Sequence, residues 1–89
     1  IKSFIYTVAE SKPYPKSMLF FNSGVYLTCE GSEVIEDLRK LESEGVEILS
    51  CGTCLDYYKL KEKLQVGQIT NMYTIYDRIR NATNTVNIG

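Results

Sequence analysis

VEILSCGTCLDYYKL, which spans Val46–Leu60, is the stretch of sequence that decides the fold. Val46–Leu49 is short and mainly apolar, as expected for a buried strand. Thr53 is a suitable N-cap, and the apolar pattern after it continues to Leu64, so a helix is predicted from Thr53 to near Gly67. A strand that passes directly into a helix is the building unit of α/β proteins.

Upstream of this stretch, the sequence predicts two helices and one strand. The first helix is indicated by apolar residues with helical spacing at Ile1, Phe4, Ile5 and Val8. The wholly apolar run Met18–Phe21 is typical of a strand buried on both faces. A second helix is predicted between Ser32, its N-cap, and Gly45, its terminating residue.

Downstream, the same alternation continues. Gln68–Thr70 predicts a very short strand, and Asn71 is a suitable N-cap for a last helix. The apolar stripe of that helix consists of Met72, Ile75, Tyr76 and Ile79. Thr85–Ile88 predicts a final strand. Strands that alternate with helices imply right-handed crossovers, so the predicted fold class is α/β with a parallel sheet.

Composition excludes several classes of protein. The 89 residues allow at most one small domain, and 10 basic residues scattered among 11 acidic ones form no stripe for nucleic acid. No apolar run approaches the ~20 residues that cross a membrane. The first residues do not resemble a signal peptide, and three cysteines argue against a secreted disulfide framework. A cytoplasmic location is therefore expected, where thiols stay reduced.

The chain contains no histidine. This excludes Ser-His-Asp and Cys-His catalysis within the chain, and it removes histidine as a metal ligand. A nucleophile would have to be activated by the backbone, by Lys or Arg, or by a partner protein.

Candidate site residues follow three predicted strands. The carboxyl ends of parallel strands meet at one edge of a sheet, where ligands and chemistry gather. At that edge we expect the paired thiols of Cys51 and Cys54. The neighbouring candidates for binding are Asn22, Ser23, Gly24, Gly52, Thr53 and Asn71.

Four interpretations of the cysteine pair remain open. Both residues can be small buried side chains at a strand–helix junction. A zinc site would need four ligands, and only Cys29 could add a third cysteine, so no metal is expected. A thioredoxin-type dithiol also opens a helix, but Pro13 and Pro15 both lie upstream of the pair. The fourth interpretation is a reactive thiol that handles sulfur, stabilised as a thiolate at the start of the helix.

Five short strings occur in a specific order: Asn22–Val25 (NSGV), Glu30–Ser32 (EGS), Cys51–Asp56 (CGTCLD), Val66–Gly67 (VG) and Thr70–Met72 (TNM). Together they resemble the C-terminal domain of YedF-type proteins, which are sulfurtransferase-like selenium metabolism proteins of the DsrE/DsrF-like superfamily. The resemblance covers nearly the whole chain. It implies a three-layer α/β/α sandwich with a five-stranded parallel sheet.

The same resemblance implies a single DsrE/DsrF-like domain over residues 1–89 that is incomplete at its N-terminus. In that fold the first strand is internal, between the second strand and the last. The chain corresponds to the domain from partway through its first helix onward, so this central strand is expected to be missing. A gap in the sheet is the expected consequence.

The family also implies a role for the thiols. In sulfur-relay members the reactive cysteine follows the third strand, which by position matches Cys51. It would carry a persulfide, with Cys54 as a resolving or supporting thiol. Implied partners are sulfur donor and acceptor proteins, among them a TusA-like carrier domain, and further copies of the chain. Selenium is a second cargo that the resemblance implies, and no cofactor is expected.

The leading hypothesis is therefore a sulfurtransferase-like domain that carries a persulfide on Cys51, with its status as an enzyme left open. One alternative is a non-catalytic oligomeric interaction module with the same fold. The other is a dithiol redox switch between Cys51 and Cys54.

Overall fold

The computed structural model describes residues 1–81 and 84–89, in which helices and strands alternate along the chain. The helices are α1 (Lys2–Glu10), α2 (Ile35–Ser43), α3 (Gly52–Tyr57) and α4 (Met72–Asn81). The strands are β1 (Ser17–Phe20), β2 (Glu47–Cys51), β3 (Gln68–Thr70) and β4 (Thr85–Ile88). Two short 3-10 helices are η1 (Asn22–Thr28) and η2 (Lys61–Lys63). The predicted order of elements is confirmed.

The four strands form one parallel sheet in the order β3-β2-β1-β4. β1 is central, and its Ser17 is in register with Glu47 of β2 on one side and Thr85 of β4 on the other. The sheet is therefore continuous among the described strands, and the expected gap next to β1 is not found. Direct pairing with β4 satisfies the backbone groups along that edge of β1, all four of whose residues are buried.

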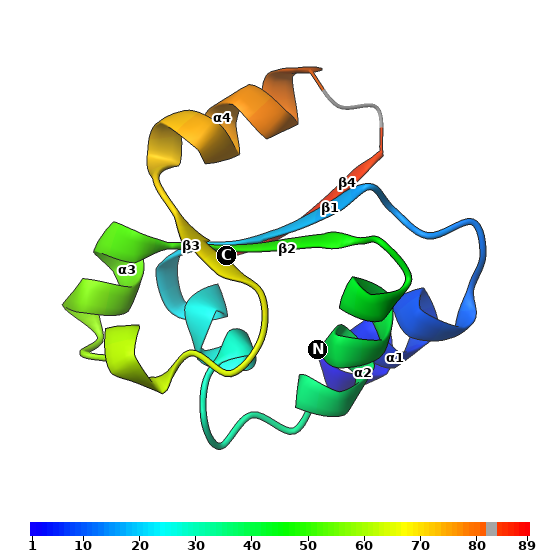
Figure 1. Ribbon diagram of the computed structural model, residues 1–89, viewed down its shortest axis with the longest axis horizontal. Helices are drawn as coiled ribbons and strands as arrows, with labels where there is room; N and C mark the ends of the chain where they lie inside the picture. The colour runs from blue at the N-terminus through cyan, green and yellow to red at the C-terminus, as the bar shows by residue number, and fades with distance from the viewer. Residues whose placement is uncertain (82–83) are drawn as a thin grey trace.

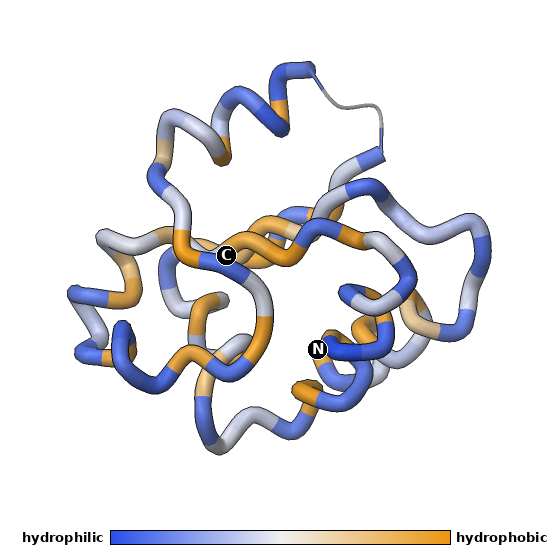
Figure 2. The backbone as a smooth tube through the Cα atoms, in the orientation of Figure 1, coloured by the Kyte–Doolittle hydropathy of each residue, from blue (hydrophilic) through white to orange (hydrophobic). Residues whose placement is uncertain are grey.

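Helices cover both faces of the sheet, which gives the predicted three-layer α/β/α arrangement. Figure 1 shows α4 alone on one face and α1 with α2 on the other, while α3 lies beyond the carboxyl ends of the strands. η1 packs on the same face as α1 and α2. The apolar residues in Figure 2 concentrate on the strands and on the inner sides of the helices. None of the described helices has the length and apolar character needed to span a bilayer.

The main core lies between the sheet and the layer of α1 and α2. Met18 and Phe20 of β1 point into it, and Val34, Leu38 and Leu41 are buried there as the predicted stripe of the second helix. The face predicted for α1 is only partly correct. Ile5 and Ala9 are its buried residues, whereas Ile1 and Phe4 are exposed.

The helix predicted to start at Thr53 differs most from its expected form. α3 begins at Gly52, with Cys51 at the N-cap, and ends at Tyr57, so Thr53 is no cap. Lys59 then adopts a left-handed conformation with φ of 58°, and the Leu60 amide donates to the Leu55 carbonyl over 2.8 Å. This hydrogen-bond pattern closes a helix by a Schellman-type turn, even without glycine.

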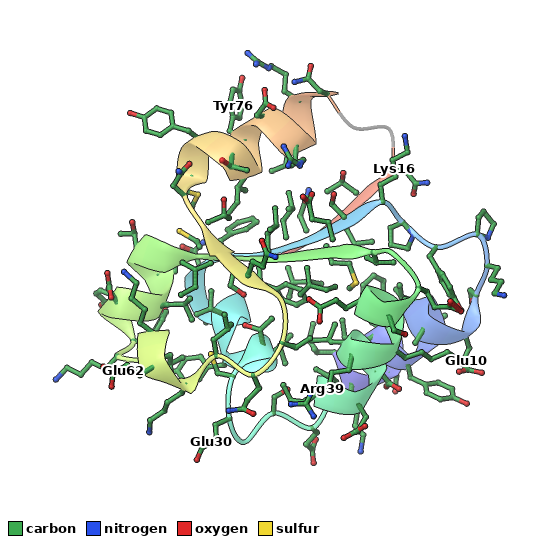
Figure 3. The ribbon with its side chains drawn as sticks, in the orientation of Figure 1. Glu10, Lys16, Glu30, Arg39, Glu62 and Tyr76 are labelled. Atoms are coloured by element: carbon green, nitrogen blue, oxygen red, sulfur yellow. The ribbon has the colours of Figure 1, made fainter. Side chains whose placement is uncertain are left out.

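The last helix begins as predicted. The Asn71 Oδ1 atom accepts a hydrogen bond of 2.9 Å from the Thr74 amide and so caps α4. Of its predicted apolar stripe, however, only Ile75 is buried against the sheet. Tyr76 extends outward from α4, away from the strands (Figure 3).

Candidate functional site

The cysteine pair lies at the carboxyl edge of the sheet, as the topology predicts. Cys51 is the last residue of β2 and is in register with Thr70 at the end of β3. One residue, Phe21, separates Asn22 from the end of β1, and the Asn22 backbone N–H donates to the Cys54 Sγ atom over 3.1 Å. The structure therefore brings the ends of three neighbouring strands to one site.

Cys54 is the thiol that faces the surface. It is partly buried and lines a hollow of about 290 Å³ together with Asn22, Thr53, Tyr57 and Tyr58. No charged side chain belongs to this lining. An incoming group would meet the Cys54 sulfur between an amide and two phenol rings.

Cys51 lies behind Cys54 and is 0% exposed. It packs in a small apolar cluster with Leu19, Leu49 and Ile75, between the sheet and α4. Cys54 packs against this cluster, and the neighbouring Cys51 raises the pKa of the Cys54 thiol. As the N-cap and the third residue of α3, the two cysteines are placed on one side of the first helical turn.

Burial is the main influence on the protonation of Cys54, and it raises the pKa of this thiol above its ordinary value. The hydrogen bond from the Asn22 amide acts in the opposite direction and lowers the pKa, while the neighbouring Cys51 raises it further. At Cys54, burial outweighs the stabilisation of a thiolate that was expected at this site.

Cys29 lies outside this site. It is fully buried, and its pKa is raised by burial, although the Thr28 hydroxyl lowers it in part. Its sulfur faces the Leu60 carbonyl at 3.9 Å. We regard Cys29 as a packed core residue.

The two glycines among the candidate residues have structural roles. A Cβ atom on Gly24 would overlap the carbonyl group of Ile88, so its absence lets η1 approach β4 closely. At Gly52 a Cβ atom would lie 3.1 Å from the Ile69 Cγ2 atom and 3.2 Å from the Thr70 carbonyl oxygen. Gly52 therefore lets α3 start against β3.

The three remaining candidates lie at different distances from the thiols. Thr53 lines the hollow beside Cys54. Ser23 lines a separate hollow formed by η1 and the end of β4. Asn71 uses its side-chain oxygen to cap α4, which accounts for its place after β3.

The sequence did not single out Tyr57 and Tyr58 as site residues. Tyr58 packs its ring against Tyr26 of η1, with centroids 5.0 Å apart, and forms an edge contact with Tyr57 at 4.9 Å. Their position one helical turn after Cys54 is the signal that could have identified them, because residues three and four apart share a helix face.

Within the described ranges, no group of three or more acidic or cysteine side chains is placed to hold a metal ion. No protein-family model matches the chain, and the curated proteins contain no significant match to it. Fold and site geometry together define a small parallel α/β domain with a two-cysteine site at the carboxyl edge of its sheet.

Proposed function

We propose that this chain is a persulfide-carrying sulfur-transfer domain of the DsrE/DsrF-like kind, acting in the cytoplasm. The observation that carries the proposal is the pair of thiols in the first turn of α3 at the carboxyl edge, with Cys54 facing a hollow and Cys51 buried. The short strings that resemble those of YedF-type domains favour the same chemistry.

The exposure of the thiols leads us to assign the first step to Cys54 rather than Cys51. The Cys54 thiolate attacks the terminal sulfur of a donor persulfide, and a new S–S bond forms at Cys54. The S–S bond of the donor breaks. The inner sulfur of the donor leaves with the electron pair and takes up a proton to become a thiol. Cys51, at 0% exposure, cannot meet a donor in this conformation and serves as the second thiol.

Transfer onward follows the same reaction in reverse, with the thiol of an acceptor protein attacking the outer sulfur on Cys54. A TusA-like carrier domain is a suitable partner, since it presents a thiol or persulfide of its own. Selenium in the same oxidation state would form the equivalent bond to Cys54, so either element is a chemically reasonable cargo.

Association with further copies is part of the proposal. Large apolar side chains on β3 and α4 are exposed, and Tyr73 reaches 89% exposure. The exposed members are Ile69, Met72, Tyr73, Tyr76 and Ile79. Such a concentration of apolar surface on α4 and the adjoining β3 supports an oligomer.

The proposal is tested by incubating the protein with a low-molecular-weight persulfide and measuring its intact mass without reductant. We expect wild type and Cys51→Ser to gain one sulfur atom and Cys54→Ser to gain none. Cys29→Ser is the matched control and should gain sulfur as wild type does. Uptake by Cys54→Ser but not by Cys51→Ser would return the carrier role to Cys51. No uptake by any variant would refute sulfur transfer.

A dithiol switch is the second candidate, because Cys51 at the N-cap and Cys54 at the third residue of α3 lie on one side of its first turn. Oxidation would join the Cys51 and Cys54 sulfurs and transfer two hydrogen atoms to an oxidant such as a small disulfide. The same mass measurement distinguishes this outcome, since the wild-type chain would lose two hydrogen atoms and gain no sulfur. Neither Cys51→Ser nor Cys54→Ser could form this disulfide, because each variant lacks one of the two thiols.

A further inference from the structure

Asn22 has an unusual backbone conformation directly beside the reacting thiol. Its φ is 50°, in the left-handed region that residues other than glycine rarely adopt. It follows the extended residue Phe21, whose φ is −146°, and it starts the turn of η1. Asparagine is one of the few residues that enter this region at modest cost.

The hydrogen bonds around this turn leave one amide for the site. The Phe21 amide donates to the Ile88 carbonyl over 3.0 Å, and the Phe21 carbonyl accepts from the Gly24 amide over 2.9 Å. The next amide along the chain, that of Asn22, donates to the Cys54 sulfur. Two backbone hydrogen bonds therefore hold the chain at Phe21, just after β1, and the Asn22 N–H is directed at Cys54.

We propose that Asn22 is a positioning residue whose left-handed backbone aims its own N–H at the Cys54 sulfur and stabilises the thiolate there. The effect comes from the main chain, and the side-chain amide of Asn22 is not required for it. The inference rests on the proposed function only in taking Cys54 as the reacting thiol.

The surroundings of Cys54 give this amide its importance. The titratable groups around the thiol are Cys51 from β2 and the phenols of Tyr57, at the end of α3, and Tyr58, its C-cap. None of them is a cation, and the lining of the hollow contains no Lys or Arg. A negative charge on Cys54 is consequently balanced by the hydrogen bond from Asn22, which also acts against the effect of burial on the thiol pKa.

The test compares three substitutions at one position in a Cys51→Ala background, where Cys54 titrates without its partner thiol. Asn22→Gly keeps the backbone N–H and tolerates a positive φ. Asn22→Val also keeps the N–H, but its β-branched side chain strongly disfavours a positive φ. Asn22→Ala disfavours a positive φ in the same way but to a smaller degree. The readout is the alkylation rate of Cys54 against pH, measured by peptide mass, with circular dichroism to confirm folding.

We expect Asn22→Gly to keep the apparent pKa of the parent and Asn22→Val to raise it by about one pH unit, the size of one hydrogen bond to a charged group. Asn22→Ala should shift it in the same direction and by less. If Asn22→Val does not fold, the comparison of Ala with Gly decides the question. Equal pKa values in all variants would overturn the inference. An Asn22→Gly shift as large as that of Val would overturn it too, because the side chain would then be responsible.

Failure of this inference can be separated from failure of the proposed function. Sulfur uptake by wild type together with an unchanged pKa in Asn22→Val would leave sulfur transfer standing and remove the role of Asn22. A raised pKa without any sulfur uptake in wild type would support the role of Asn22 as a thiolate donor and refute sulfur transfer.

Discussion

Ser50 and Cys51 are neighbours in β2 and point to opposite faces of the sheet, as successive strand residues do. Cys51 packs toward α4, whereas the Ser50 hydroxyl is 2.8 Å from the Thr28 hydroxyl on the other face. Thr28 donates its single O–H to the Val25 carbonyl over 3.0 Å, so Ser50 must be the donor in the pair. This buried chain of hydrogen bonds ties η1 to β2 directly beneath the thiol site.

Removal of the Thr28 hydroxyl should therefore destabilise the protein. Thr28→Val leaves the buried Ser50 hydroxyl without an acceptor, and we expect the free energy of unfolding to fall by about 1–3 kcal/mol. Thr7→Val, which removes an exposed hydroxyl bonded to the Ser3 carbonyl, is the matched control and should change it by less than about 0.5 kcal/mol. Urea denaturation measures both.

A double-mutant cycle makes this test sharper. Ser50→Ala combined with Thr28→Val removes both partners, so the double variant should be more stable than the sum of the single effects predicts. Strictly additive losses would show that the two hydroxyls do not depend on each other.

At the scale of elements, the early end of α3 shapes the hollow at Cys54. The left-handed Lys59 closes the helix, and the following Leu60 packs into the same core cluster as Leu55. A continuous helix would have carried this segment away from β2. The turn instead returns the chain to η2, where the Glu30 amide donates to the Lys63 carbonyl over 2.8 Å.

Glycine should suit the Lys59 position better than lysine does. Because a left-handed conformation costs a residue with a Cβ atom roughly 1–2 kcal/mol, Lys59→Gly should stabilise the fold by about 0.5–1 kcal/mol after the extra freedom of the unfolded chain is subtracted. The control is Lys63→Gly, at an exposed residue of η2, which should lower stability by a similar amount. Equal losses in both variants, measured by denaturant unfolding, would contradict the role given to Lys59.

At the scale of the whole molecule, the two faces of the sheet are unequally supported. The face toward α1 and α2 carries the main core, whereas α4 contributes only Ile75 as a fully buried apolar residue on the other face (Figure 1). The Arg78 guanidinium adds a clamp, donating to both Glu47 carboxylate oxygens over 2.8 and 3.1 Å. The layer formed by α4 should open more readily than the rest of the fold.

Glu47 should therefore influence α4 selectively. The hydrogen bonds from Arg78, supported by Ser17, hold the pKa of the Glu47 carboxyl below its ordinary value, although burial opposes them. Both side chains of the clamp are more than one third exposed, so we expect only about 0.5–1 kcal/mol from it. Glu47→Gln should lower the hydrogen-exchange protection of α4 amides about two- to fivefold at neutral pH, with little change in β1.

The sign of the pH dependence follows from the lowered pKa. A carboxyl group with a depressed folded-state pKa contributes stability above its unfolded pKa and loses that contribution as the pH falls through the folded value. The difference between wild type and Glu47→Gln should consequently shrink toward zero in acid. The exposed carboxylate of Glu33 is the control, and a Glu33→Gln effect on α4 as large as that of Glu47→Gln would argue against the clamp.

The sequence by itself determined the features that depend on near neighbours along the chain. Helical spacing in the second helix, the wholly apolar run of β1 and the Asn71 cap each involve residues within about one helical turn or one short strand of each other. Together they predicted the parallel α/β class and placed the cysteine pair at the carboxyl edge of the sheet.

Only the tertiary structure decided which thiol faces the surface, where α3 ends and what lies beside β1. Asn22 and Cys54 are separated by 32 positions in the sequence, and β1 pairs with β4 across most of the chain. The burial of Cys51 depends likewise on Leu19 and Ile75, from elements on either side of it in the sequence. No local pattern encodes these contacts, because burial and hydrogen bonding at the site are produced by segments that meet only when the sheet is formed.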